Sequence, residues 1–157
     1  FDLVRYLIGS EPISVNTLSW NLPWGWHTGD ASHIALFEFE SGIRFIHRAM
    51  GCSKGKPTSW FGDCRIEGEL GTIIWKDEKL FLTSYHKKNK PIEKKINFLV
   101  DKSNNDFSIV LDTFLKSIKN NNEPECSAKD NLNTLAMTLG AVKSAQQNKK
   151  ILINEIR

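Results

Sequence analysis

The predicted fold is organised around the stretch WFGDCRIEGELGT, residues Trp60–Thr72. Aromatic, charged and apolar residues alternate over residues 58–67 as they do in a β-strand, and Gly68 and Gly71 interrupt the pattern before the next apolar run. We expect an upstream hairpin to be able to pair with this strand and further strands to follow it. Two amphipathic helices in the last third of the chain are long enough to cover one face of the sheet.

The upstream strands are predicted from alternating residues over 11–20 and from a hairpin. The hairpin joins residues 32–40 to residues 43–50 through Ser41-Gly42. Its first strand is apolar on both faces, which indicates that both faces of the sheet are covered. Because only two long helices follow, we expect one face to be closed by something outside this chain, such as a second copy or a neighbouring domain.

Downstream, residues 73–75 and 80–85 predict a second hairpin that turns at Asp77-Glu78, and residues 92–98 predict another strand. A short strand is also expected at residues 151–153. Residues 92–98 alternate apolar residues with charged ones. We interpret the strands over residues 73–98 as scaffold.

Helices are expected at both ends of the chain. Residues 1–8 have helical spacing and stop at Gly9. No capping residue precedes them, so we expect that a longer helix has been cut and that the polypeptide is a fragment. A second helix should start at Asn104 or Asn105, and a third should run from about residue 128 to Asn148.

Each long helix carries a stripe of apolar residues that we expect to lie in the core. The stripes are Phe107, Val110, Leu111, Phe114, Leu115 and Ile118 in one helix, and Leu132, Leu135, Ala136, Leu139, Val142 and Ala145 in the other. The whole pattern predicts a single α+β domain over residues 1–157, with a predominantly antiparallel, open-faced sheet and helices packed on one face.

The composition excludes several classes of protein. With 40% hydrophobic and 25% charged residues, the 157-residue chain has the profile of a soluble domain that buries its own core. Its net charge is only +3, and its one dense lysine run surrounds Pro91, so we expect no nucleic-acid partner. No apolar run approaches the ~20 residues that span a bilayer, so we expect no membrane association.

The three cysteines are odd in number and lack a Cys-x-x-Cys spacing. They predict neither a disulfide framework nor a metal site, and they fit a reducing, cytoplasmic setting. Nucleotide-binding, hydrolase and zinc-protease motifs are missing, and no Cys/His pair stands in a recognisable nucleophile context.

Tryptophans stand out in the predicted loop NLPWGWHTGD, residues 21–30, where Trp24 and Trp26 flank Gly25 and precede His27. Two interpretations stay open. The rings fold back to plug the edge of the core, or they form a stacking wall for a sugar or another flat ligand. Separately, we expect His47 to lie inside the protein as a hydrogen-bonded core residue.

Four segments, in this order, carry a resemblance to a known family. They are Asp2–Gly9 (DLVRYLIG), Phe37–Gly42 (FEFESG), Ile66–Thr72 (IEGELGT), and the run from Asp130-Asn131-Leu132 through Val142–Ala145. Together they resemble the C-terminal domain of the Gfo/Idh/MocA oxidoreductases, the glucose-fructose oxidoreductase and inositol dehydrogenase family. The likeness extends from the first residue almost to the last.

The resemblance implies that the full-length parent is an NAD(P)-dependent oxidoreductase acting on CH-OH groups of a sugar, cyclitol or related polyol. Family members bind NAD or NADP in an N-terminal Rossmann domain, use a lysine in a Glu-Lys-Pro motif, and carry an Asp-x-x-x-His motif that ends just before the position of Phe1. None of these is in this chain. The chain therefore contributes no catalytic, cofactor-binding or metal-binding residue, and we expect it to be inactive alone.

The same resemblance implies that this domain contacts the substrate and packs sheet to sheet into a homodimer or homotetramer. Trp60 matches the place of an aromatic residue that family members present to the substrate. Asp63 or Arg65 could bind hydroxyls or a carboxylate, but strand alternation places them on the phase opposite Trp60. The candidate substrate-binding residues are Trp60, Asp63, Arg65, His47, Arg44, Trp24 and Trp26, with Arg48 beside them.

A different class of function stays open beside this one. The same sheet could belong to a non-catalytic module that binds a carbohydrate or a protein partner, without nucleotide chemistry in the parent. A Gly-x-Gly-x-x-Gly strand-turn-helix and a Glu-Lys-Pro motif ahead of Phe1 would favour the oxidoreductase, and their absence would favour the module.

Overall fold

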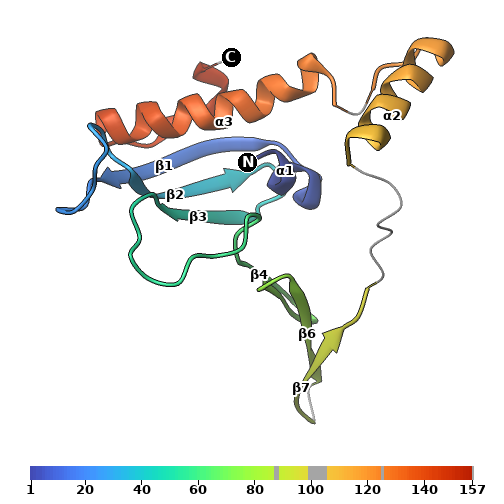
Figure 1. Ribbon diagram of the computed structural model, residues 1–157, viewed down its shortest axis with the longest axis horizontal. Helices are drawn as coiled ribbons and strands as arrows, with labels where there is room; N and C mark the ends of the chain where they lie inside the picture. Colours follow the sequence, from blue (N-terminus) through green and yellow to red (C-terminus); the bar gives the residue numbers. More distant parts are fainter. Residues whose placement is uncertain (87–88, 99–105, 125, 157) are drawn as a thin grey trace. The chain divides into compact units, whose positions relative to one another are not determined.

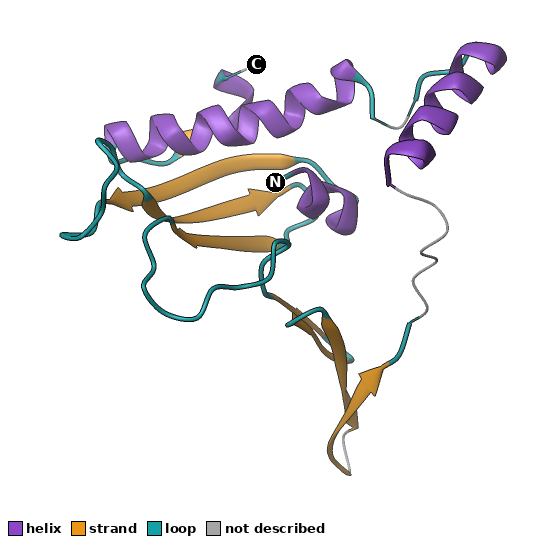
Figure 2. Ribbon diagram, in the orientation of Figure 1, coloured by secondary structure: helices purple, strands orange, loops and turns teal. Residues whose placement is uncertain are grey.

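The structure is a computed structural model that describes residues 1–86, 89–98, 106–124 and 126–156 (Figures 1 and 2). The elements in chain order are α1 (Asp2–Ile8), β1 (Pro12–Trp20), β2 (Ser32–Phe39), β3 (Arg44–Met50), β4 (Cys64–Gly68), β5 (Gly71–Lys76), β6 (Lys79–His86), β7 (Asn89–Ile96), α2 (Asp106–Asn120), α3 (Ala128–Gln147), β8 (Ile151–Leu152) and a 3-10 turn (Ile153–Glu155). The predicted α+β class is confirmed. None of the described helices is long and apolar enough to cross a membrane.

The chain divides into two compact units, and each is described by itself. The first unit combines Phe1–Cys52 with Val110–Arg157, and the second is Ser53–Ile109. Each unit holds its own four-stranded sheet, ordered β3-β2-β1-β8 in the first and β4-β5-β6-β7 in the second. All strand pairs that are described are antiparallel.

The first sheet has one covered face and one open face. Helix α3 runs along the covered face, with α1 beside it (Figure 1). Val15 of β1 and Ala35 and Phe37 of β2 are fully buried there. Side chains of a strand alternate between the two faces. The opposite face therefore carries exposed aliphatic residues, and we call it the open face: Leu18, Ile34, Leu36 and Ile46. The expectation of one uncovered apolar face is met within this unit.

Helix α3 meets the sheet through small side chains, which corrects the predicted stripe. Its buried residues are Ala136, Met137, Gly140, Ala141 and Ser144, whereas Leu132, Leu135, Leu139 and Val142 are exposed. A Cβ atom on Gly140 would lie 3.0 Å from Cδ1 of Ile153 and 3.4 Å from Cγ1 of Val15. At Gly140 the helix therefore approaches β1 too closely for a large side chain, and only Ala136 of the predicted stripe is buried.

Ser144 is a polar residue on this buried face, and its hydroxyl group makes two hydrogen bonds there. The backbone N–H of Thr17 in β1 donates to Ser144 Oγ at 2.9 Å, and that hydroxyl donates to the carbonyl of Lys149 at 2.6 Å. Burying the hydroxyl costs little because it is satisfied on both sides. The helix ends as predicted at Asn148, which adopts a left-handed conformation.

The prediction for the apolar stripe of helix α2 is also corrected. Its predicted core stripe is exposed, with Phe107 75% and Ile118 63% accessible. An amphipathic pattern shows that one side of a helix is apolar, but it does not identify the surface that covers that side. The predicted N-caps Asn104 and Asn105 lie outside the described residues.

A buried arginine ties α1 to α3. Arg5 donates from Nη2 to Glu11 Oε1 at 2.8 Å and to Asp130 Oδ1 at 2.9 Å, and from Nη1 to Thr134 Oγ1 at 2.9 Å. The two carboxylates raise the pKa of the guanidinium, Asp130 contributing most, and Arg5 in turn lowers the pKa of Asp130. Helix α1 ends as predicted at Gly9, whose φ of 64° suits glycine.

The strand that was predicted over residues 58–67 is shorter in the second sheet. Strand β4 begins only at Cys64, and it pairs with β5 in register Gly68↔Gly71 rather than with the upstream hairpin. Before it, the N–H of Gly62 donates to the carbonyl of Ser59 at 2.9 Å, and Gly62 has a φ of 75°, which makes a turn. Trp60 and Asp63 therefore lie outside the strand, and its alternation does not set where they point. The turn at Asp77-Glu78 is confirmed.

Candidate functional site

A loop of the first unit that spans residues 21–31 joins β1 to β2. Hydrogen bonds to residues 51 and 52 hold it against the end of β3. The indole N–H of Trp24 donates to the carbonyl of Cys52 at 2.9 Å, and the N–H of Gly51 donates to the carbonyl of Ala31 at 2.7 Å. A Cβ atom on Gly51 would lie 2.8 Å from that carbonyl oxygen, so the close approach requires glycine.

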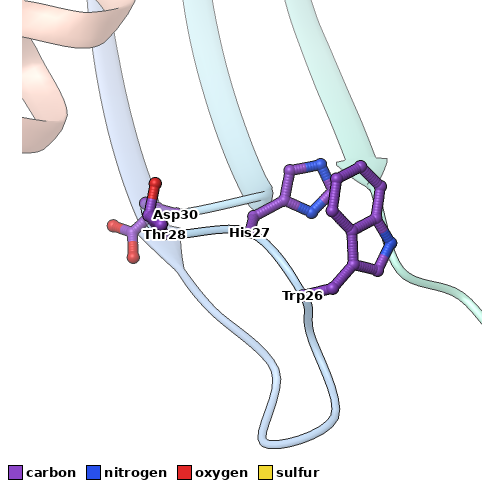
Figure 3. A pocket seen from close by; sticks show the side chains of 5 residues that line it. Trp26, His27, Thr28 and Asp30 are labelled. Carbon is purple, nitrogen blue, oxygen red and sulfur yellow. The ribbon is translucent and has the colours of Figure 1, made fainter.

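The two tryptophans of this loop have different environments. Trp24 is half-exposed and bonded to backbone, whereas Trp26 is 81% exposed. The Trp26 ring stacks on His27 with centroids 3.9 Å apart and an interplanar angle of 26° (Figure 3). Trp26 therefore does not plug the core, and of the two interpretations of the loop its exposure favours a surface for stacking.

A shallow concavity of about 340 Å³ lies at this loop, lined by Trp26, His27, Thr28, Gly29 and Asp30. Figure 3 shows the Trp26 and His27 rings side by side, with Thr28 and Asp30 on the other side of the loop. Aromatic faces of this kind pack on the apolar C–H face of a sugar, while at its edge a hydroxyl group donates or accepts hydrogen bonds and a carboxylate accepts them. The concavity is therefore lined by two aromatic rings and, across the loop, by a hydroxyl and a carboxylate.

The end of β3 adds a thiol to the same loop. Cys52 Sγ lies 3.2 Å from His27 Nδ1, within hydrogen-bonding distance, and Cys52 is partly exposed. This Cys/His contact could not be predicted from the sequence, because two strands separate the residues and loop geometry alone brings them together.

His47 lies on the covered face of β3, as predicted, and bonds to a second histidine. His33 Nε2 and His47 Nδ1 are 2.8 Å apart, and the Phe1 ring meets His47 edge-on with centroids 5.1 Å apart. Burial first, and then the neighbouring His33, lower the pKa of His47. His33 was missed, although the hairpin pattern already placed it diagonally across from His47 on the same face.

Arg44 and Arg48 lie on the exposed side of β3 and do not share a face with His47. Arg44 donates to the carbonyl of Gly42 at 2.8 Å and approaches Glu38 at 3.5 Å. Hydrogen bonds from Lys150 and then Ser14 lower the pKa of Glu38. The first unit thus separates the candidate residues into the loop, the covered face and the open side of the sheet.

Trp60, Asp63 and Arg65 belong to the second unit. Trp60 is 95% exposed in the turn before β4, and Asp63 is exposed next to it. Arg65 lies on β4, where its Nε donates to Glu67 Oε1 at 2.7 Å. Among the described residues no group of three or more His, Cys, Asp or Glu side chains is arranged to hold a metal ion.

Comparison with protein families and solved structures places this arrangement among known folds. The family model described as the oxidoreductase family, C-terminal alpha/beta domain, matches residues 1–153. No curated protein matches the sequence.

Solved structures share the fold at low sequence identity. A proposed NADPH-dependent oxidoreductase from Desulfitobacterium hafniense is 20% identical, with a TM-score of 0.81 over 99% of this chain and 46% of its own. An oxidoreductase from Agrobacterium radiobacter, in complex with NAD+, L-tartaric acid and magnesium, is 17% identical, with a TM-score of 0.76 over 99% and 47%.

The WlbA dehydrogenase from Bordetella pertussis, in complex with NADH and UDP-GlcNAcA, is 18% identical, with a TM-score of 0.69 over 96% of this chain and 43% of its own. The chain therefore spans less than half the length of each of these three proteins.

Proposed function

The chain belongs to the Gfo/Idh/MocA oxidoreductase family as its C-terminal α/β domain, and from this we propose that it is the substrate-binding and oligomerisation domain of an NAD(P)-dependent dehydrogenase or reductase. The substrate class is a sugar, cyclitol or related polyol, oxidised or reduced at a CH-OH group. The observation that carries the proposal is the family match over residues 1–153. The Agrobacterium and Bordetella structures support it, because the first contains NAD+ with a hydroxy acid and the second NADH with a nucleotide sugar.

The dinucleotide does not fit this chain. Dinucleotides are held where a parallel strand meets the N-terminus of a helix through a glycine-rich turn. All the strand pairs described here are antiparallel, and the sequence has no Gly-x-Gly-x-x-Gly motif after a strand. We therefore place NAD or NADP in an N-terminal Rossmann domain of the parent protein, and we assign no cofactor contact to these residues.

Substrate contacts are assigned first to the loop of residues 21–31. Trp26 offers an exposed ring, Asp30 a carboxylate, and Trp24 braces the loop through Cys52. Trp60 is the second aromatic candidate, with Asp63 and Arg65 near it in sequence. His47 and Arg44 point to opposite sides of β3, so at most one of the two contacts a given substrate.

Oligomerisation is assigned to the open face. Leu18, Ile34, Leu36 and Ile46 come from three adjacent strands, and the register pairs Leu18 with Ile34 and Leu36 with Ile46. Such a patch of exposed aliphatic side chains on a flat sheet is stabilised when a second sheet covers it. We propose that two copies pack open face to open face, as a homodimer or within a homotetramer.

Fluorescence titration of the full-length protein with NADH and NADPH tests the proposal, with the 157-residue chain as the control. Saturable binding by the full-length protein and none by the chain is the expected result, and a screen of sugars and cyclitols then identifies the substrate. If the full-length protein binds neither nucleotide, the oxidoreductase proposal fails. The exposed tryptophans would then favour the non-catalytic carbohydrate-binding module.

A further inference from the structure

The side chains of Cys52 and His27 are in contact, and the proposed function gives this pair no role. The sulfur and the imidazole nitrogen are 3.2 Å apart, a distance at which the nitrogen can accept the thiol proton. We propose that Cys52 and His27 form a nucleophilic dyad, in which His27 removes the thiol proton while Cys52 attacks a small carbon electrophile. This makes Cys52 a site of covalent modification, and the inference does not rest on the proposed enzymatic function.

The dyad is positioned from both sides. On the histidine side, Asn21 Nδ2 donates to the carbonyl of His27 at 2.9 Å, and the Trp26 ring stacks on the imidazole. On the cysteine side, Trp24 Nε1 donates to the carbonyl of Cys52, and the neighbouring Gly51 is bonded to Ala31. Both partners are therefore held by contacts that involve neither the sulfur nor Nδ1, so the reacting atoms are kept together before reaction.

Accessibility also suits a small reagent. Cys52 is partly exposed, and His27 lines the shallow concavity that opens to solvent beside Trp26 (Figure 3). Reactive cysteines are found in partly exposed sites next to a group that accepts or balances their charge, whereas cysteines in apolar surroundings are inert. Cys64 differs from Cys52, because it is exposed, partial desolvation raises its pKa, and no hydrogen bond joins its sulfur to a base within the described part of the chain.

The reaction with an alkyl halide balances without a redox partner. The sulfur forms a bond to carbon, the carbon–halogen bond breaks, and the halide leaves with the bonding electron pair. The thiol proton passes to His27 and then to solvent. The product thioether carries no proton, so His27 has no further role once the carbon–sulfur bond has formed.

The three cysteines of the chain allow an internally controlled experiment. The full-length protein is treated with a limiting amount of iodoacetamide at pH 7, and the alkylation rate of each cysteine is measured by peptide mass spectrometry. Cys52 is expected to react at least about tenfold faster than Cys126, although Cys126 is the more exposed of the two, because a positioned base accelerates such a step by about 10²-fold or more. Equal or slower alkylation of Cys52 would overturn the proposal, and this comparison requires no variant.

A substitution then tests the role of the imidazole. His27→Asn is expected to lower the alkylation rate of Cys52 by about tenfold or more while leaving Cys64 and Cys126 within about twofold. His33→Asn is the matched control, since it removes another imidazole of the first unit, one that bonds to His47 instead of Cys52. An unchanged Cys52 rate in a His27→Asn protein with native circular dichroism would show that His27 is not the base.

Discussion

The two faces of the first sheet are built from the same strands but differ in how far their side chains are buried. On one face Val15, Ala35 and Phe37 are fully buried under α3, and on the other Leu18, Ile34 and Leu36 remain exposed. Both faces carry large apolar side chains. The difference comes from the helix, whose small residues Ala136, Gly140 and Ala141 fit closely against one face only. The covered face should therefore determine the stability of the domain, and the open face its association.

The largest effect is expected from truncating the covered face at Phe37. Its ring contacts Phe1 with centroids 4.9 Å apart and Phe45 at 5.9 Å, and its side chain is fully buried. Phe37→Ala should lower the free energy of unfolding by about 3–5 kcal/mol, because it removes buried area and leaves a cavity. Urea denaturation followed by circular dichroism measures this loss.

Leu36→Ala is the matched control, since Leu36 is the next residue along β2 and points to the open face. It should cost only about 1 kcal/mol because the side chain is already partly hydrated. Both variants are measured on the monomeric chain, and equal losses there would contradict the view that the face under α3 determines stability.

The next largest effect is expected at Arg5, which joins the elements that cover the sheet. Arg5→Met keeps the aliphatic volume but leaves Glu11 and Asp130 without their cation. Breaking a fully buried pair costs about 3–5 kcal/mol, and here we expect about 2–3 kcal/mol because both carboxylates reach solvent. Urea denaturation at neutral pH measures the change.

Arg44→Met is the corresponding control on the exposed side of β3, where the arginine approaches Glu38 at 3.5 Å and both groups are accessible. That variant should change the free energy of unfolding by at most about 0.5 kcal/mol. A loss at Arg44 as large as the loss at Arg5 would contradict the view that burial makes the difference.

A smaller, pH-dependent effect is expected from His47 on the covered face. Its pKa is lowered in the folded protein, chiefly by burial, from an ordinary value of 6.5. The unfolded chain therefore takes up a proton more readily, so stability is fully present above pH 6.5 and declines as the pH falls through that value. His47→Gln should remove this part of the decline. Denaturation curves at pH 7.5 and 5.5 for both proteins test it, and an identical decline in the two would contradict the assignment.

Much of this fold could be predicted from local sequence. The hairpin of β2 and β3, the left-handed Gly9 that ends α1 and the turn at Asp77-Glu78 all follow from alternation and turn chemistry, which act over a few residues. The resemblance of four ordered segments to the Gfo/Idh/MocA family was confirmed by the match over residues 1–153.

The errors have a common physical cause, because they depend on contacts between distant residues. The stripe of α3 was assigned to its large aliphatic residues, yet the buried side is the one on which Gly140 and Ala141 allow close approach. Trp60 was placed on a strand because alternation continues through it, whereas Gly62 turns the chain before β4 begins. The pairing of Cys52 with His27 arises from loop geometry that no spacing encodes.

The smallest effect on stability, but a decisive one for association, is expected on the open face. Ile46 is 68% exposed on β3, opposite Leu36, so Ile46→Glu should change the free energy of unfolding of the isolated chain by no more than about 0.5 kcal/mol. If two open faces pack together, the same change buries charge in an apolar interface and should dissociate the assembly. Light scattering coupled to size-exclusion chromatography measures the mass of the full-length protein and the variant.

Tyr6→Glu is the control, because Tyr6 is comparably exposed but lies on α1, on the covered side. An oligomer that survives Ile46→Glu at wild-type affinity would show that the open face is not the interface. Dissociation by Ile46→Glu alone would show that the sheet uses one face to fold and the other to associate.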